Sequence, residues 1–563
     1  MCLESYRRVS FQLILIIVFI ADVSYASAAD KKGPLPGSMF DVRLYGAVGN
    51  GNTINTAAIQ KAIDAASAAG GGTVYMAGGT FLSGTLYLKS HVTLYIESGA
   101  TLRGSTRLED FPVNIPEYRS YTDYYVTRSL IHAEKQSNIT ITGRGVIDGQ
   151  GRTFHEKPIK ERPFLMRIIE CNDVKVEGIT LRNSPCWVQH YLACNNVVIE
   201  NITVDSMATY NNDGIDIDSC DKVRIANCNI SCYDDAIVLK STSDRACRNI
   251  VITNCVLKTN CHAFKLGTES NGGFQNIAFS NSTIYDSTAG VALELVDGGE
   301  FDGVSVSDIM MSNVGNALFV RLGNRARPYK GTVAGKGGVT GSDFEITDKA
   351  ARPGMGTMQN IIISNIQARG IHGVGCAVAG IPGHEIKNIT FDNIRMRFRG
   401  GGLPEAVERD IPEVEREYPD PNMFGKLPAY GFYFRHVRNL RFSDAELSFE
   451  GDDHRPAVVC DDVKDAVITG FDAQSASLCK GLLYFRNVDG VYVHSSRPRA
   501  AAAPFVYVAD SNSKNVCISN NDFGRVEQVL KCGQGVDSNA VYVADNHTYD
   551  PCTIKKTIRF GTE

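Results

Sequence analysis

The sequence lacks the features that mark nucleic-acid-binding and membrane proteins. Its 563 residues include 57 basic and 62 acidic side chains, so the net charge is −5. Without a basic excess, we expect neither nucleic acid nor an anionic membrane surface as a partner. There is one tryptophan against 53 glycines, and this glycine content, with mixed polarity, indicates many turns.

No long hydrophobic run follows the first 28 residues. Residues 1–28 themselves have the pattern of a signal peptide, with Arg7 and Arg8 before an apolar run and small residues at 26–28. The run is short for a bilayer span, and an uncleaved anchor is the alternative. We therefore expect a secreted or periplasmic protein without membrane contact after cleavage. The oligomeric state stays open.

Cysteine spacings typical of a zinc site are also absent. The sixteen cysteines are spread over a long chain instead of concentrated in a short one, which argues against a disulfide scaffold. Cys228 and Cys255 fall at the same phase of the repeat described next. We expect mostly buried thiols with at most a few bridges, and neither a metal nor a cofactor.

What the sequence does contain is a repeat. Each unit opens with an apolar, any, apolar triplet, and after a first step of 35 residues the uninterrupted steps are 23 to 28 residues. The triplets begin at Ile139, Val174, Val197, Val223, Ile250, Ile277, Val304, Ile361, Ile389, Leu440, Val467, Val491, Val516 and Val541. Asn or Asp follows four residues later in most units, at Asn201, Asn227, Asn254, Asn281, Asp308, Asn365, Asn393 and Asp444. Such a column can bond its own backbone and its copy in the next coil, so we expect it to be buried.

Short strands, fixed turns and a near-constant step predict an all-β, single-domain, right-handed parallel β-helix over 29–563. A leucine-rich repeat lacks its signature here, and a propeller needs blades of roughly 40 residues or more. Residues 55–68 have helical apolar spacing and would form an N-terminal capping helix. Two long steps predict loop insertions at about 312–355 and 400–430, shaping a binding face or, for the second, a disordered decoration. Residues 470–563 would add coils or a cap.

Three carboxylates fall in two successive units. Asp213 lies in one unit, and Asp234 and Asp235 lie one coil later. Stacking places equivalent residues of neighbouring coils about 4.8 Å apart. Acids so close repel one another, so at least one should keep its proton near neutrality, leaving an acid and a base. Glycoside hydrolysis needs such a pair. The alternative is that these aspartates are only turn or ladder residues.

The strands that follow these acids can be aligned on Gly214, Ala236, Ala263 and Ala292. This alignment predicts one outward row of Asp216, Val238, Lys265 and Glu294, and another of Asp218, Lys240 and Gly267. Charges in these rows would pair across coils. The expected ion pairs are Asp218 with Lys240 and Lys265 with Glu294.

Three ordered motifs resemble a known family. They are Asn211-x-Asp213-Gly214, Asp234-Asp235 and a flanked His262, and in this order they look like the polygalacturonase-type glycoside hydrolases of family 28. The resemblance extends over roughly residues 39–470. It implies a pectin-degrading enzyme with an inverting mechanism. It further implies Asp234 as general acid, Asp213 and Asp235 as the groups that activate water, His262 as an orienting residue, and Asn211 as a contact to sugar or acid.

The chain departs from the family where a galacturonate carboxylate would be gripped. The usual Arg-Ile-Lys falls at 292–294, where Glu294 stands instead. Either Lys265, Lys240 or a loop arginine such as Arg321 replaces the clamp, or the sugar bound there is neutral, as in rhamnogalacturonan. The insertions favour a closed pocket and exo-action.

Three functional hypotheses follow from the sequence. The leading one is hydrolysis of a pectic backbone, at galacturonide or rhamnogalacturonan linkages. The second is a pectic polysaccharide lyase of the same architecture, whose product would absorb ultraviolet light. The third is a non-catalytic carbohydrate-binding β-helix.

Overall fold

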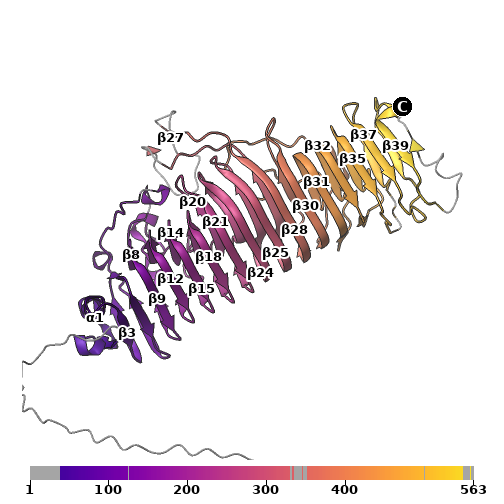
Figure 1. The fold of residues 1–563 in the computed structure, drawn as a ribbon. Coiled ribbons are helices and arrows are strands. Elements are labelled where there is room, and N and C mark those ends of the chain that lie inside the picture. Colours follow the sequence, from indigo (N-terminus) through magenta and orange to yellow (C-terminus); the bar gives the residue numbers. More distant parts are fainter. Residues whose placement is uncertain are drawn as a thin grey trace, which may run out of the picture.

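The chain folds as an elongated right-handed parallel β-helix, with coils stacked in sequence order from α1 at one end to β39 at the other (Figure 1). This computed structural model describes residues 38–329, 333–334, 345–346, 352–548 and 558–559, apart from positions 119, 125, 500 and 502. The expected signal peptide lies outside the described residues. The predicted fold class is confirmed.

The triplets form the first face of the solenoid. The first and third side chains of the triplets point into the core. Parallel pairing runs from Ile139 through Val174, Val197 and on to Val541, one residue per coil. Apart from the long strands described below, the strands that lie wholly or partly on this face are β1 (Ser38–Asp41), β3 (Gly72–Met76), β6 (Val92–Ile96), β9 (Ser137–Gly143), β12 (Asn172–Glu177), β15 (Asn195–Glu200), β18 (Asp221–Ala226), β21 (Cys247–Thr253), β32 (Val458–Thr469), β35 (Asp489–His494), β37 (Lys514–Ser519) and β39 (Val541–Ala544).

Two further faces complete each coil. The second face holds β2 (Asn50–Ile54), β4 (Gly79–Ser83), β7 (Ala100–Gly104), β10 (Val146–Asp148), β13 (Thr180–Arg182), β16 (Thr203–Ser206), β19 (Asn229–Cys232), β22 (Val256–Thr259) and β33 (Asp472–Ala473). The third face holds β5 (Leu86–Tyr87), β8 (Ser129–Glu134), β11 (Phe164–Ile169), β14 (Gln189–Leu192), β17 (Ile215–Asp218), β20 (Ile237–Ser241), β23 (His262–Ser270), β29 (Cys376–Ala379), β34 (Leu483–Arg486), β36 (Val506–Val508), β38 (Leu530–Cys532) and β40 (Ile558–Arg559).

In the middle of the solenoid, single long strands bend around more than one face. They are β24 (Gly273–Leu295), β25 (Glu300–Leu322), β28 (Thr357–Ile371), β30 (Ile386–Phe398) and β31 (Phe432–Phe449). Their inward side chains join those of the shorter strands in one continuous apolar core. The pairing keeps its register along most of the axis, with local shifts between β2 and β4, between β20 and β23, and between β28 and β30.

The helix α1 (Thr56–Ala68) covers the N-terminal end of the stack. Its buried face consists of Ile59, Ala62, Ile63 and Ala66, which removes the first coil's apolar end from water. Asn55 occupies the N-cap position, but its side chain does not cap the helix. Instead its carbonyl oxygen accepts from the Val48 amide at 2.7 Å, which ties the preceding loop to the helix start.

The Asn/Asp column differs from the expectation that it is buried. Asn201 and Asn281 are exposed, and so are the side-chain bonds that link Asn254 to Asn227 and Asn393 to Asn365. All eight column residues have a positive φ between 48° and 58°. Asn and Asp tolerate this left-handed conformation better than other non-glycine residues, so the turn geometry, not burial, explains the column.

Two sequence boundaries also need correction. Ala466, not Val467, continues the inward column, because Leu440 pairs with Ala466 and Ala466 with Val491. The predicted start of the first insertion at about 312 is too early, since β25 runs on to Leu322. The two-stranded β26 (Val333–Ala334) and β27 (Glu345–Ile346) lie within this insertion.

The second insertion, between Phe398 and Phe432, packs on the third face. Val407, Ile411, Phe424 and Leu427 are buried against outward side chains of that face, which include Phe319, Ala377, Tyr433 and Tyr484. The insertion is thus an ordered cover over coils that follow the acidic motifs, and not a disordered decoration.

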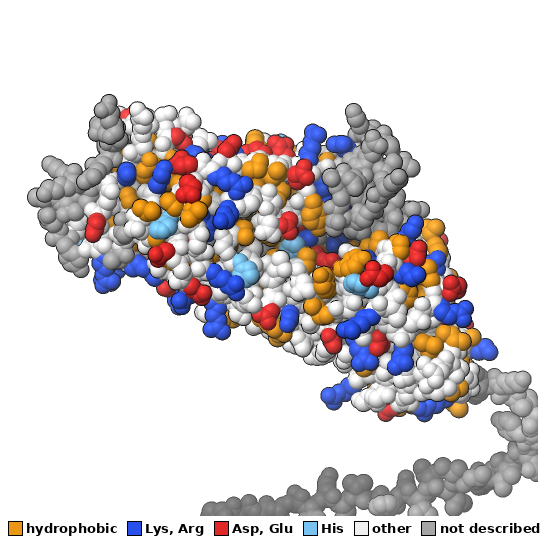
Figure 2. Space-filling view, turned by 180° about the vertical axis from the view of Figure 1, so that it is seen from behind, with side chains coloured by type: hydrophobic (Ala, Val, Ile, Leu, Met, Phe, Trp, Pro, Cys, Tyr) orange, Lys and Arg blue, Asp and Glu red, His pale blue; other side chains and the backbone are white. Residues whose placement is uncertain are grey.

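The fourteen cysteines of the described residues are free thiols, and all but Cys261 and Cys517 are buried. Acidic and basic side chains are interspersed over the face shown in Figure 2. Within the described ranges, no helix has the length and apolar character needed to cross a membrane.

Candidate active site

Three aspartates meet where neighbouring strands of the third face begin. Asp213 precedes β17, and Asp234 and Asp235 precede β20, one coil later. Backbone bonds hold the turns in register: Gly214 N donates to Asp235 O at 2.8 Å and Ala236 N donates to His262 O at 2.9 Å. Carboxylate oxygens of Asp213, Asp234 and Asp235 consequently lie within 4.8 Å of one another.

Asp235 is buried and held in its ionised form. Lys265 Nζ lies 3.3 Å from Asp235 Oδ2, and His262 Nδ1 lies 2.8 Å from Asp235 Oδ1. Burial by itself raises the pKa of Asp235, but Lys265 and His262 outweigh it and hold the pKa well below its ordinary range. His262 also donates its backbone amide to Asp235 at 3.2 Å, so this histidine orients the carboxylate.

Asp213 and Asp234 are shifted in the opposite direction. Burial and the facing charge of Asp234 raise the pKa of Asp213, while burial and the charge of Asp235 raise the pKa of Asp234. Asp234 is the only one of the three that is more than slightly exposed. Asn211 Nδ2 lies 3.5 Å from Asp234 Oδ2, and Arg162 holds Asn211 Oδ1 at 2.7 Å. The site therefore combines a charged carboxylate with a proton-holding pair.

A fourth buried aspartate, Asp216, sits beneath this group. Lys240 Nζ lies 3.5 Å from Asp213 and 3.7 Å from Asp216, and its ammonium also lies 4.7 Å from the centre of the Trp187 ring. The predicted pair of Asp218 with Lys240 does not form. Asp218 instead accepts a hydrogen bond from Thr242 Oγ1 at 2.5 Å and faces His190 Nε2 at 3.2 Å.

The predicted outward row is displaced by two residues at its last strand. Lys265 pairs with Ala292, while Glu294 pairs with Arg321, because the matching of Ala263 with Ala292 was out of register. The ion pair of Lys265 with Glu294 nevertheless forms, at 3.8 Å. Glu294 is fully buried and accepts from Thr268 at 3.1 Å, so it faces the protein, not a substrate.

Arg321 is likewise not a free substrate contact. Its guanidinium donates to the backbone carbonyls of Gly380 at 2.9 Å and Glu413 at 2.6 Å. Burial lowers its pKa to about 10. Glu413 belongs to the second insertion, so Arg321 anchors that insertion to the third face.

Residues from both insertions reach the acidic group, and the sequence had no periodic signal for them. Tyr418 Oη lies 3.3 Å from Lys265 Nζ, and the Arg325 guanidinium lies 5.7 Å from the Tyr418 ring centre. Arg325 and Arg327 approach Glu269 at 3.5 and 3.4 Å. Burial opposes ionisation of Glu269, yet Lys240, Arg325 and Arg327 lower its pKa to about 2.

Two groups of described residues have the spacing to share a cation: the three aspartates, and Asp235 with Cys261 and His262. In both groups the ammonium groups of Lys240 and Lys265 already compensate acidic charge. A cation bound to either group would therefore lie close to a lysine ammonium that already contacts one of its carboxylates.

His436 fastens the second insertion by a contact that depends on pH. Its Nδ1 lies 2.7 Å from Asp462 and its Nε2 lies 3.1 Å from Glu413, so both nitrogens donate only if the ring is protonated. Arg435 also contacts Glu413, and Lys464 lies 3.8 Å from Asp462. Burial opposes the charge, but the two carboxylates outweigh it and raise the pKa of His436.

A raised pKa in the folded protein stabilises it at pH values below the ordinary histidine pKa of about 6.5, and this contribution is lost as pH rises through the raised value. We expect His436→Asn to cost about 1–2 kcal/mol at pH 5.5 and much less at pH 8.5. Asn suits the positive φ of 52° at this position. Thermal unfolding across this pH range measures the difference. A loss of stability that is independent of pH would contradict a role for the protonated His436 ring in fastening the insertion.

The chain is similar to known proteins over the region that contains the three aspartates. Residues 72–351, which contain the three aspartates, match the family model described as glycosyl hydrolases family 28. A probable polygalacturonase of Vitis vinifera is 36% identical over 214 residues, covering 36% of this chain and 44% of the relative. An exopolygalacturonase of Zea mays is 29% identical over 251 residues, covering 42% and 57%. The chain thus spans about half the length of the curated relatives it matches.

A solved structure shares the architecture over a longer stretch. The family 28 exopolygalacturonase of Yersinia enterocolitica superimposes with a TM-score of 0.58 at 19% identity, covering 76% of this chain and 78% of that one. At this identity the likeness establishes the fold alone.

Proposed function

Because residues 72–351 place this chain in glycosyl hydrolase family 28, we propose that it hydrolyses the backbone of a pectic polysaccharide. The observation that carries the proposal is that the carboxyl groups of three aspartates lie within 4.8 Å of one another, yet their pKa values are shifted in opposite directions. Lys265 and His262 keep Asp235 charged, whereas Asp213 and Asp234 have raised pKa values. General acid and base are thereby present together at one pH.

In the proposed reaction, Asp234 gives its proton to the glycosidic oxygen as the bond to the anomeric carbon breaks. A water molecule attacks that carbon and loses its proton to Asp235, assisted by Asp213. Asp234 then carries a negative charge and Asp235 a proton, and exchange with solvent restores the starting state. Asp234 suits the role of acid because it is the most accessible of the three.

Inversion at the anomeric carbon is part of the proposal, and it rests on the family resemblance. Carboxyl groups are generally about 6.5–9.5 Å apart in inverting enzymes and about 5–5.5 Å apart in retaining ones. The closest carboxylate oxygens here lie within 4.8 Å of one another, which is below both ranges. The separation therefore does not distinguish an inverting from a retaining mechanism. Proton NMR of the first-formed product anomer tests it directly.

Exo-action on a galacturonide end is the leading form of the proposal. Tyr418 and Arg325, from two different insertions, narrow one side of the acidic group. The Zea mays relative is an exopolygalacturonase by name.

We also propose export through residues 1–28, which N-terminal sequencing of the exported protein would test by a start near Ala29.

A rhamnogalacturonan hydrolase is the second candidate. Lys240, Lys265, Arg325 and Arg327 each contact protein carboxylates, so these four cations already have partners in the protein. A neutral rhamnose next to the acids needs no such clamp. This observation supports the second candidate.

Product profiling on homogalacturonan and rhamnogalacturonan in parallel separates these possibilities. We expect release of single galacturonate units from homogalacturonan, without absorbance of an unsaturated uronide. Faster cleavage of rhamnogalacturonan would shift the assignment to the second candidate. An ultraviolet-absorbing product would make the chain a lyase, and no reducing ends from either polymer would leave only a binding role.

A further inference from the structure

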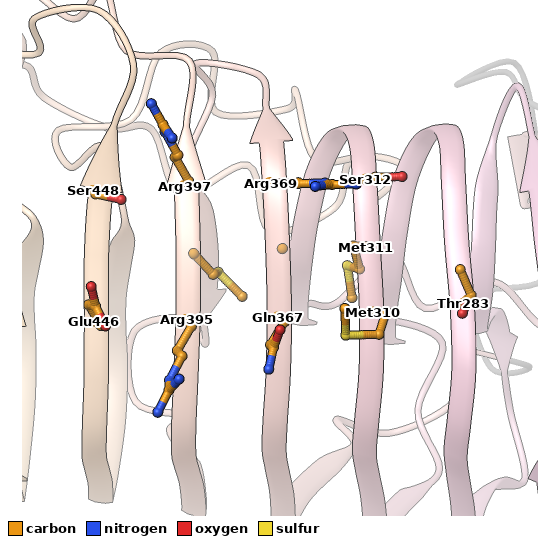
Figure 3. A pocket seen from close by; sticks show the side chains of 12 residues that line it. Thr283, Met310, Met311, Ser312, Gln367, Arg369, Arg395, Arg397, Glu446 and Ser448 are labelled. Atoms are coloured by element: carbon orange, nitrogen blue, oxygen red, sulfur yellow. The ribbon is translucent and has the colours of Figure 1, made fainter.

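A groove of about 520 Å³ crosses the second face, away from the aspartates of the third face. Figure 3 shows it spanning successive strands, from Thr283 on β24 to Glu446 and Ser448 on β31. Arg369 on β28 and Arg395 and Arg397 on β30 line its middle. We call this feature the arginine groove.

The register of the solenoid arranges its side chains in two rows. One row runs through Met310, Gln367, Arg395 and Glu446. The other runs through Ser312, Arg369, Arg397 and Ser448. Neighbouring members of a row are about 4.8 Å apart, so the side-chain positions of the arginine groove recur at a short, regular interval along the solenoid axis. An extended polymer lying along that axis would meet equivalent positions at each coil.

The three arginines are not explained by internal pairing. Among the described residues, no carboxylate lies within 4.0 Å of Arg369 or Arg395, and Arg397 meets Glu450 only at 3.8 Å with both side chains largely exposed. Glu446 is paired with Arg499 at 3.0 Å. Arg369 and Arg397 face each other across adjacent strands, where like charges destabilise a sheet. The chain as a whole is negatively charged, so general basicity does not produce this cluster.

An apolar surface adjoins the charges. Met310 is 51% exposed and borders the groove, with Met311 and Met396 buried beside it. Methionine is flexible and polarisable, and adapts to irregular ligand surfaces. Guanidinium groups bind carboxylates through charge-assisted, often paired, hydrogen bonds. The arginine groove thus offers carboxylate contacts beside a surface for the C–H face of a sugar ring.

We propose that the arginine groove is a non-catalytic binding site for an acidic polysaccharide chain, whose uronate carboxylates contact Arg369, Arg395 and Arg397. The choice of a uronide rests on the proposed function, because a pectic backbone is the anionic polymer that the acidic site would cleave. Binding on a second face would hold the enzyme on the polymer while chain ends enter the site on the third face. The interaction is non-covalent and needs no metal.

The test uses the full chain carrying Asp234→Asn, so that the polymer is not cleaved, with excess trigalacturonate present to fill the acidic site. Binding of de-esterified polygalacturonate is then measured at low salt by affinity electrophoresis. We expect Arg369→Ala/Arg395→Ala to weaken this binding about tenfold. The matched control, Lys387→Ala/Arg441→Ala, removes two exposed positive charges from β30 and β31 on the first face and should change it less than twofold.

Several results would overturn the proposal. They are equal weakening in the control, equal binding of fully methyl-esterified pectin, or a change in sedimentation coefficient caused by the arginine substitutions, which would mark an interface between copies. Failure of the proposed function is read separately, as absence of hydrolysis by the chain that retains Asp234. Because the binding experiment does not depend on hydrolysis, the binding proposal and the proposed function can each fail while the other holds.

Discussion

Asp234→Asn is expected to lower kcat/KM on a pectic polymer about 10³-fold, with little change in KM. The reason is that asparagine preserves the shape of the side chain and the contact with Asn211 but has no proton to give to the leaving oxygen. General acid catalysis contributes roughly 10²–10⁴-fold. Steady-state release of reducing ends measures the loss.

A substrate with a good leaving group makes this test specific to the acid role. An aryl galacturonide needs little protonation of its leaving oxygen, so Asp234→Asn should keep most of its activity on it. The matched control is Asp205→Asn, which makes the same chemical change at an exposed position on β16 and should leave both activities unchanged. Equal losses on polymer and aryl substrate would show that Asp234 is not the acid.

Lys265→Met is expected to cost about 3–5 kcal/mol of stability at pH 7 and to abolish most activity. Lys265 is 2% exposed and lies between Asp235 at 3.3 Å and Glu294 at 3.8 Å. Removing one partner of a buried ionic group leaves the other charges uncompensated, and such changes typically cost about this much. Denaturant unfolding measures the stability, and a pH–rate profile measures the activity.

The pH dependence follows from the direction of the Asp235 shift. A lowered pKa in the folded protein gives stability that is present above the ordinary aspartate pKa of about 3.9 and is lost as pH falls through the lowered value. Without Lys265 the pKa of Asp235 rises, so the acid limb of the activity profile moves to higher pH. The stability deficit should shrink towards pH 4, where the carboxyls take up protons.

Two controls accompany Lys265→Met. Lys258→Met removes a half-exposed lysine whose ammonium lies 3.9 Å from Asp286, and it should cost less than about 1 kcal/mol. Glu294→Gln added to Lys265→Met should recover part of the stability, because it removes one unpaired buried charge. A mild effect of Lys265→Met, or no recovery in the double variant, would show that this cluster is not coupled as described.

The sequence by itself determined the architecture and the coil on which each acid lies. Apolar triplets at steps of 23 to 28 residues can bury both of their inward side chains only by stacking, so the period predicts the solenoid. It also places Asp213, Asp234 and Asp235 in adjacent turns. It predicts the turns of the Asn/Asp column too, although it wrongly predicts their burial, and their left-handed conformation comes from the structure.

The sequence predicted the pair of Lys265 with Glu294, but only the tertiary structure decided the other charge contacts of the site. The alignment of Ala263 with Ala292 slipped by two residues because β23 and β24 offer the same apolar alternation at both registers, and alternation has a period of two. Lys240 contacts Asp213 and Asp216 and not Asp218, because its long side chain can reach several carboxylates and the residue spacing does not show which of them it meets. Tyr418, Arg321 and the arginine groove depend on contacts between distant segments, and the insertion that carries Tyr418 has no period from which its position could be predicted.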